Sequence, residues 1–170
     1  MSITIGLFGT CGGSKWRDRF MQVYAEKGID FYNPNMSGRT PEMKLAEGRH
    51  LAEDQIILFP VTDETYATGS LSEVGFSILQ AIKINNRRDF VIMIAQDLQP
   101  KLKEEPLMAK ESLRARALVS VHLRKLEMSN LYLVDTLDEM LEASLILHKA
   151  ATLRETLAKY NPQNLRIPAP

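Results

Sequence analysis

The chain has 170 residues, which is typical of one globular domain, and its 21 lysines and arginines balance 21 aspartates and glutamates. Such a balance gives no argument for nucleic acid or an anionic membrane as a partner. The single cysteine, Cys11, excludes an internal disulfide framework, and no apolar run approaches the roughly 20 residues that span a bilayer. Because the start "MSITIGLFG" is also not typical of a signal peptide, we expect a cytoplasmic protein with one domain over residues 1–160 and a tail over 161–170.

Strands and helices alternate along the predicted elements. Residues 3–9 form an apolar run typical of a buried strand, and a helix from Ser14, as its N-cap, to Gly28 follows. A strand at 29–33 precedes a helix at 40–54 that starts with Thr40 as a cap and Pro41. The later elements are strands at 55–61, 90–95 and 130–135 and helices at 70–85, 110–127 and 137–160, with an irregular loop at 96–110.

This alternation predicts an α/β fold. Short connections and continuous apolar strands favour a five-stranded parallel sheet with helices on both faces, which is a flavodoxin-like three-layer sandwich of strand order 2-1-3-4-5. Ligands in such sheets bind outside the carboxyl ends of the strands, near the point where the order reverses. The loops after the first three strands are therefore the candidate site.

The loop "GTCGGSKWR" after the first strand permits two interpretations. Its glycines allow the backbone to approach a ligand closely, and the following helix start offers N–H groups to an anion, but a tight turn explains the glycines equally well. Cys11 and Arg17 have the C-x5-R spacing that resembles the phosphate loop of low-molecular-weight tyrosine phosphatases, in which the cysteine is the nucleophile. Asp18, however, stands where that family has serine or threonine, and the chain has no Asp-Pro sequence.

The stretch "SLSE" before the third predicted helix also has two explanations. Ser70 and Glu73 fit a capping box, in which the serine is the N-cap and the glutamate is the third helical residue. Glu73 also lies off the predicted apolar face and at the rim where a ligand would bind, so it is a candidate for chemistry. The spacing does not separate a cap from a catalytic carboxylate.

Four segments in order, "FGTCGGSKWR", "FYNPN", "AEDQIILFPVT" and "GSLSEVGFS", resemble the nucleoside 2-deoxyribosyltransferase-like family. The resemblance covers residues from Leu7 to Gln80 and implies that Glu73 attacks the anomeric carbon of a nucleoside or nucleotide. It implies further that Glu47 protonates the leaving base and that Asp63 faces the sugar, with no metal or other cofactor. It places the substrate against nine residues: Phe8, where studied members have tyrosine, Gly9, Cys11, Gly12, Gly13, Asn33, Pro34, Gly69 and Ser70.

Three functions stay open at this point: glycosyl transfer or hydrolysis at Glu73, phosphatase chemistry at Cys11, and nucleotide binding without turnover. The resemblance also implies a homodimer or higher homo-oligomer, and a second partly apolar stripe on the last predicted helix agrees with this. His50, His122 and His148 are scattered over helices, so we expect them to be structural or exposed. Their spacing, with that of the cysteine and the acids, is not typical of a metal site.

Overall fold

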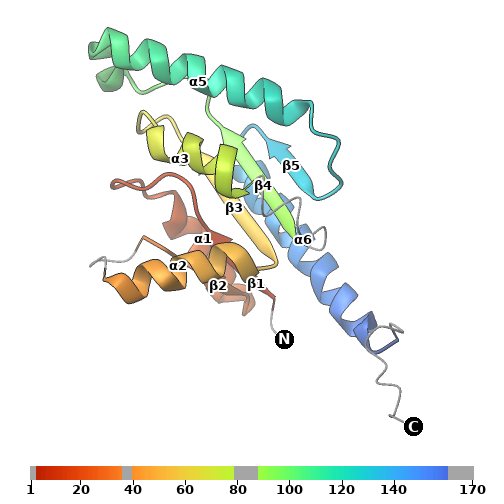
Figure 1. Ribbon diagram of the computed structural model, residues 1–170. Helices are drawn as coiled ribbons and strands as arrows, with labels where there is room; N and C mark the ends of the chain where they lie inside the picture. The colour runs from red at the N-terminus through yellow and green to blue at the C-terminus, as the bar shows by residue number, and fades with distance from the viewer. Residues whose placement is uncertain (1–2, 36–39, 79–87, 161–170) are drawn as a thin grey trace.

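A five-stranded, all-parallel sheet in the order β2-β1-β3-β4-β5 forms the middle layer of the protein (Figure 1). The computed structural model describes residues 3–35, 40–78 and 88–160. The strands are β1 (Thr4–Leu7), β2 (Asp30–Tyr32), β3 (Ile56–Val61), β4 (Asp89–Ile94) and β5 (Leu131–Val134). The strand β1 pairs with β2 on one side and with β3 on the other, which confirms the predicted order and its reversal at β1.

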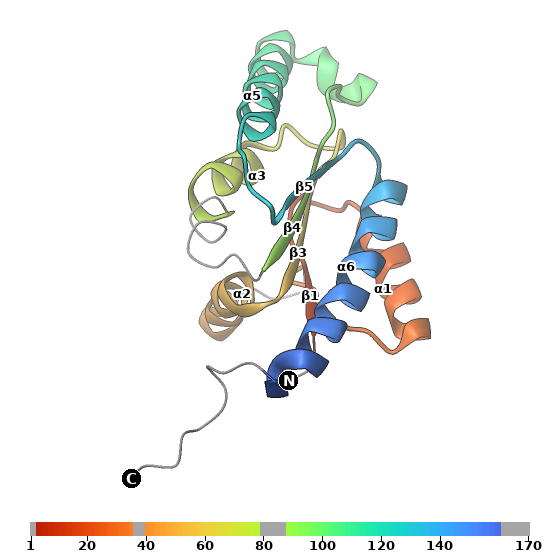
Figure 2. The same ribbon diagram turned by 90° about the vertical axis from the view of Figure 1, so that its right-hand side faces the viewer.

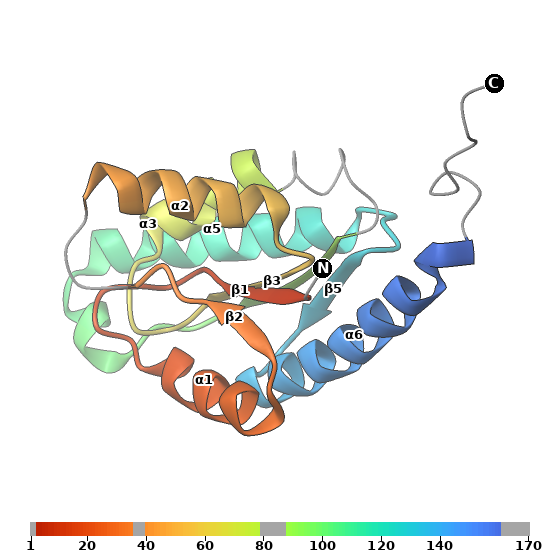
Figure 3. The same cartoon turned by 90° about the horizontal axis from the view of Figure 1, so that it is seen from below.

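Helices cover both faces of this sheet. The helices α1 (Trp16–Lys27) and α6 (Leu137–Leu157) lie on one face, and α2 (Pro41–Glu53), α3 (Thr68–Glu73) and α5 (Pro106–Arg124) lie on the other (Figures 2 and 3). A π-helical turn (Val74–Ile78) continues α3, and 3-10 turns lie at Pro100–Glu104 and Ala158–Tyr160. No helix in the described parts of the chain has the length and apolar character needed to cross a membrane.

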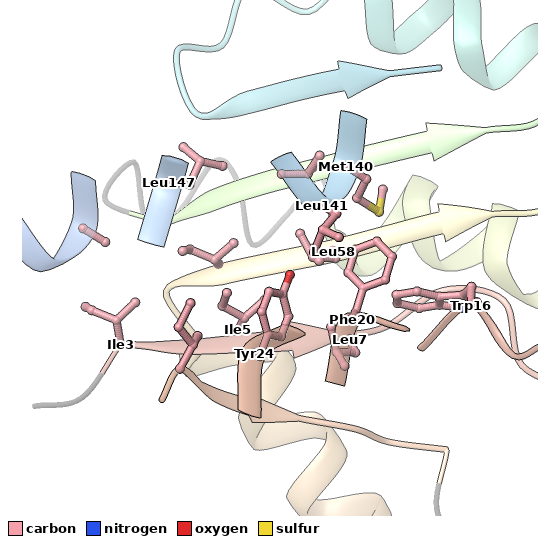
Figure 4. Packing of buried hydrophobic residues seen from close by; sticks show 14 of the residues in the cluster. Ile3, Ile5, Leu7, Trp16, Phe20, Tyr24, Leu58, Met140, Leu141 and Leu147 are labelled. Atoms are coloured by element: carbon pink, nitrogen blue, oxygen red, sulfur yellow. The ribbon is translucent and has the colours of Figure 1, made fainter. Parts of the chain in front are cut away.

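Side chains along each central strand alternate between the two faces of the sheet, so each face has its own apolar cluster, which packs against the helices that cover it. Under α1 and α6, Phe20 and Tyr24 pack with Leu58 and Met140 (Figure 4). On the opposite face, Phe59 and its neighbours pack against residues of α3, the π-helical turn and α5. Both clusters are buried, as expected for a parallel sheet covered on both sides.

The starts of several helices differ from the prediction. Thr40 caps α2 as expected, since its side chain accepts a hydrogen bond from the backbone N–H of Met43 at 3.3 Å. Ser14 is not the N-cap of α1, because its hydroxyl donates to the Glu64 carboxylate instead and Lys15 takes the cap position. The helix α5 begins at Pro106, inside the stretch expected to be an irregular loop. Most of the predicted third helix, from residue 79 on, and the predicted tail at 161–170 lie outside the described residues.

Candidate active site

A cavity of about 510 Å³ lies at the carboxyl end of the sheet, between α2, α3 and the loops after β1 and β2. Its volume is within the range of small-molecule sites. Eight of the candidate residues line it: Phe8, Gly9, Cys11, Pro34, Glu47, Gly69, Ser70 and Glu73. The structure therefore brings together segments that are far apart in the sequence, at the edge where ligands bind in this fold.

Glu73 is not part of a capping box, so the capping interpretation is wrong. The helix α3 begins at Thr68, two residues before the expected cap, and its N-cap is Ala67 in a left-handed conformation (φ 57°). Ser70 and Glu73 consequently lie inside the helix, and Glu73 is its last residue. The side chain of Glu73 is exposed and lines the cavity.

The segment before α3 is fixed by buried contacts that no local pattern indicates. Arg116 of α5 is fully buried and donates to the backbone oxygens of Thr62 and Thr65, at 2.9 and 2.7 Å. Ser112 of α5 donates to the backbone oxygen of Tyr66 at 2.9 Å. These contacts set where the chain turns into α3, and the π-helical turn after Glu73 is of a kind that is frequent at functional sites.

The loop after β1 is held closely against β3. Gly9 has a φ of 90°, and a Cβ atom at this position would lie 2.4 Å from the backbone oxygen of Pro60. Thr10 is buried beside it, donates from its backbone N–H to the same oxygen at 2.8 Å, and accepts from the backbone N–H of Thr62 at 2.9 Å. The close approach that glycine allows thus brings Gly9 and Cys11 to the cavity wall.

Cys11 and Arg17 do meet, but Arg17 is turned into the protein. Its guanidinium is buried and donates to the backbone oxygens of Leu7 at 2.8 Å, Thr10 at 2.7 Å and Gly9 at 3.4 Å, with Cys11 Sγ at 3.7 Å. Burial lowers the pKa of Arg17, and nearby Cys11 and Glu47 oppose that shift. A phosphate loop needs inward N–H groups and an arginine available to the ligand. Here the loop presents carbonyl oxygens to the arginine, which weighs against a phosphatase.

The helix α2 forms the opposite wall and contributes three lining residues that the sequence pattern did not single out: Lys44, Gly48 and Leu51. Together with Glu47 they occupy positions three or four residues apart along the helix, so all four lie on one helical face. This spacing could have predicted the three residues from the position of Glu47. Glu47 is half-buried. Burial, then the charge of Glu47, then that of Asp54 raise the pKa of Tyr32.

Four candidate residues lie elsewhere. Asp63 lines a separate cavity of about 280 Å³ with Lys15 and Glu64, so it does not join Glu73 and Glu47. Gly12 and Gly13 are exposed in the loop, outside the set of described residues that line the main cavity. The side-chain oxygen of Asn33 accepts from the backbone N–H of Asn35 at 2.9 Å, and Asn33 shapes the turn after β2 rather than the cavity surface.

Among the residues that the structure describes, no cluster of three or more histidine, cysteine, aspartate or glutamate side chains is arranged to hold a metal ion. Comparison with known proteins adds no assignment. No protein-family model matches the chain, and no curated protein matches it.

Proposed function

We propose that the protein transfers or hydrolyses the glycosyl group of a (deoxy)nucleoside or nucleotide, with Glu73 as the nucleophile. The observation that carries this proposal is the position of Glu73. It is an exposed carboxylate that does not cap its helix, and it lines the same cavity as a second carboxylate, Glu47. Most enzymes that cleave or transfer glycosyl groups use a pair of carboxylates at one site. The resemblance of the four sequence segments to deoxyribosyltransferases supports the same assignment.

The reaction has two steps. In the first, a carboxylate oxygen of Glu73 attacks C1′ of the sugar, the C1′–N bond breaks, and the base leaves with the bonding electrons and a proton from Glu47. In the second, Glu47 takes a proton from water or from an incoming base, which attacks C1′. The C1′–O bond to Glu73 then breaks, and the configuration at C1′ is retained.

The other lining residues suit such a substrate. Phe8 offers an apolar surface, whereas Ser70 and Cys11 offer hydrogen-bonding groups. Lys44 brings a positive charge to the cavity, which favours an anionic substrate such as a nucleoside monophosphate. Most ligand cavities combine these features: an apolar lining and a few polar groups that fix orientation.

Base release from a panel of nucleosides and nucleoside monophosphates, with and without an acceptor base, tests the proposal. We expect release by the wild type and a loss of about a thousandfold or more in Glu73→Gln, as for removal of other enzymatic nucleophiles. Intact-mass spectrometry of quenched wild-type protein is expected to show one added glycosyl unit that Glu73→Gln lacks. Glu26→Gln, an exposed change on α1, serves as the matched control.

Two results would contradict the proposal. Absence of base release from every substrate would leave either a nucleotide-binding protein or a phosphatase. Release of inorganic phosphate that disappears in Cys11→Ser but persists in Glu73→Gln would instead establish the phosphatase.

The proposal extends to location and assembly. A single cysteine suits the reducing cytoplasm. On α6, Ile146, Leu153 and Leu157 are 57–61% exposed, and their spacing of seven and four residues aligns them on one face of the helix. The apolar stripe that was expected from the sequence to lie at an interface, which contains Met140, Ser144, Leu147 and Ala151, is instead buried inside the protein. We infer that the exposed face packs against a second copy of the chain. Light scattering of the wild type is expected to show a dimer or larger assembly. Leu153→Glu is expected to dissociate this assembly, whereas the control Leu118→Glu on α5 is not. A monomeric wild type would contradict the inferred interface.

A further inference from the structure

The helix α3 separates two cavities on the same face of the sheet, because it lies between α2 and α5 (Figures 1 and 2). Ser70 and Glu73 line the main cavity on the α2 side. Thr68, Leu71 and Ser72 line a second cavity of about 460 Å³ on the α5 side. The two linings share no described residue, so the second cavity is a separate site, and its volume suits a small molecule.

Part of the lining of the second cavity is apolar. Four of its side chains belong to this part: Leu71 of α3 and Met108, Ala115 and Val119 of α5. Leu71 is buried, and Ala115 and Val119 pack against the apolar cluster around Phe59. Met108 is 51% exposed. Such a surface favours a ligand with an apolar body, which leaves water when it binds there.

The hydroxyl groups of the second cavity offer acceptors rather than donors. The Ser72 hydroxyl donates to the backbone oxygen of Thr68 at 2.9 Å. The Ser112 hydroxyl donates to the backbone oxygen of Tyr66 at 2.9 Å. The Tyr66 hydroxyl donates in turn to the backbone oxygen of Leu102, also at 2.9 Å. Because a hydroxyl has one hydrogen to donate, these three groups can offer a ligand only their lone pairs.

The charge in this lining is negative. Glu111 of α5 contributes a carboxylate that is 67% exposed and lies 4.0 Å from Arg114 in a surface ion pair, a kind of contact that is weak. Among the described residues that line the second cavity, none is a lysine or an arginine. A complementary ligand therefore carries a positive charge and hydrogen-bond donors beside its apolar body, which is the chemistry of a protonated organic amine.

We propose that the second cavity binds a small organic amine in its protonated form, and that the bound amine restrains α3 and with it Glu73. The ammonium group faces Glu111 and the hydroxyl oxygens, and the apolar part packs on Leu71 and Val119. The helix α3 has only six residues and continues into the π-helical turn at Val74–Ile78. A helix this short is positioned by the contacts on either side of it, so a ligand on the α5 side also acts on the α2 side. The effect on Glu73 as a nucleophile rests on the proposed function, whereas the binding does not.

NMR titration of the isotopically labelled full-length protein tests the binding. The three probes share one apolar body and differ in charge: 2-phenylethylamine, 2-phenylethanol and 3-phenylpropanoate. The amine is expected to shift signals of residues 68–72 and 108–119. It is also expected to bind about fivefold more tightly than the alcohol, the ratio that a favourable exposed ion pair gives, and the carboxylate is expected to bind most weakly.

Three exposed substitutions locate the site and its charge. Met108→Lys places a cation in the lining and is expected to weaken amine binding about fivefold. Leu107→Lys is the matched control, because it adds the same charge at the neighbouring position, which is 80% exposed and outside the described lining. Glu111→Gln removes the carboxylate and is expected to lower the affinity for the amine to that for the alcohol. All three positions are exposed, so the fold should be retained.

Hydrogen–deuterium exchange measures the restraint of α3. At an amine concentration of about ten times Kd, protection of residues 68–73 is expected to rise up to about tenfold, because an opening that disrupts the site must first release the ligand. The rise should be smaller in Met108→Lys at the same concentration. Where base release is found, saturating amine is expected to change kcat of the wild type about fivefold or more, a typical strength of coupling between two sites.

Several results would overturn the proposal. Amine binding no tighter than that of the alcohol, or shifts confined to residues of the main cavity, would exclude the amine site. Equal weakening in Leu107→Lys and Met108→Lys would do the same. Binding without a rise in the protection of residues 68–73 would exclude the restraint of α3, and an unchanged kcat would exclude the effect on Glu73. Failure of the proposed function removes only the kcat readout and leaves the titration and exchange experiments intact.

Discussion

Arg17 is the buried side chain whose replacement tests the organisation of the loop after β1. In Arg17→Met, which keeps most of the side-chain volume, the backbone oxygens of Leu7 and Thr10 lose charged donors at 2.8 and 2.7 Å. Hydrogen bonds to charged groups contribute about 1.5–3 kcal/mol each, so we expect a loss of about 3–6 kcal/mol in the free energy of unfolding. For a domain of this size, this corresponds to a Tm about 10–20 °C lower.

Urea and thermal unfolding of Arg17→Met measure this loss. The matched control is Arg19→Met on the same helix, because the Arg19 side chain is 60% exposed and pairs with exposed Asp138. Such surface pairs contribute about 1 kcal/mol or less. A loss below about 1 kcal/mol in Arg17→Met as well would refute the reasoning. It would mean that the guanidinium does not hold the loop and is available to a phosphate, as the phosphatase interpretation requires.

Three further predictions concern stability. Gly9→Ala is expected to lower the free energy of unfolding by about 3 kcal/mol or more. Gly13 has a similar φ but nothing within 4 Å of a Cβ atom, so Gly13→Ala should lose only the backbone strain of about 1–2 kcal/mol. Equal losses in urea unfolding would refute the close approach of Gly9 to β3. Thr136→Ala removes the capping box of α6 and should cost about 1 kcal/mol in urea unfolding, more than Thr152→Ala within the helix. Burial raises the pKa of Tyr24, so its contribution to stability is present below its ordinary pKa and is lost as the pH rises above about 10. Tyr24→Phe should therefore make unfolding free energy less dependent on pH from about pH 9 to 11, and an unchanged slope would contradict the sign of the shift.

The sheet was predictable because its determinants are local. Each strand is a short apolar run bounded by turn residues, and the strict alternation with helices leaves few topologies for a parallel sheet. The cap of α2 was predictable for the same reason, since Thr40 and Pro41 are adjacent in the sequence. The starts of α1 and α3 were not, because residues distant in the sequence determine them. Glu64 takes the hydroxyl of Ser14, and Arg116 fixes the backbone before Thr68.

The candidate site was likewise predictable only where local sequence determines it. The rule that ligands bind at the carboxyl ends of strands placed Glu73, Phe8 and Gly9 at one edge, and the structure brings them to one cavity. Asp63 also follows a strand, but its loop turns to the cavity beside Lys15, and the direction of a loop cannot be read from its composition. The stacking of the His50 ring on Tyr32 and the contact of His50 with Asp54 were not predictable either, because they depend on how the end of α2 packs against β2.

All described residues that line the main cavity lie between Phe8 and Glu73, in the first half of the chain. The second half, with β4, α5, β5 and α6, supports this part through contacts such as those of Arg116. The described lining of the main cavity is therefore encoded by one continuous stretch of the gene product. Labels or fused domains attached at exposed positions of α5 and α6, away from buried Ser112 and Arg116, are therefore expected to leave the lining of the main cavity unchanged.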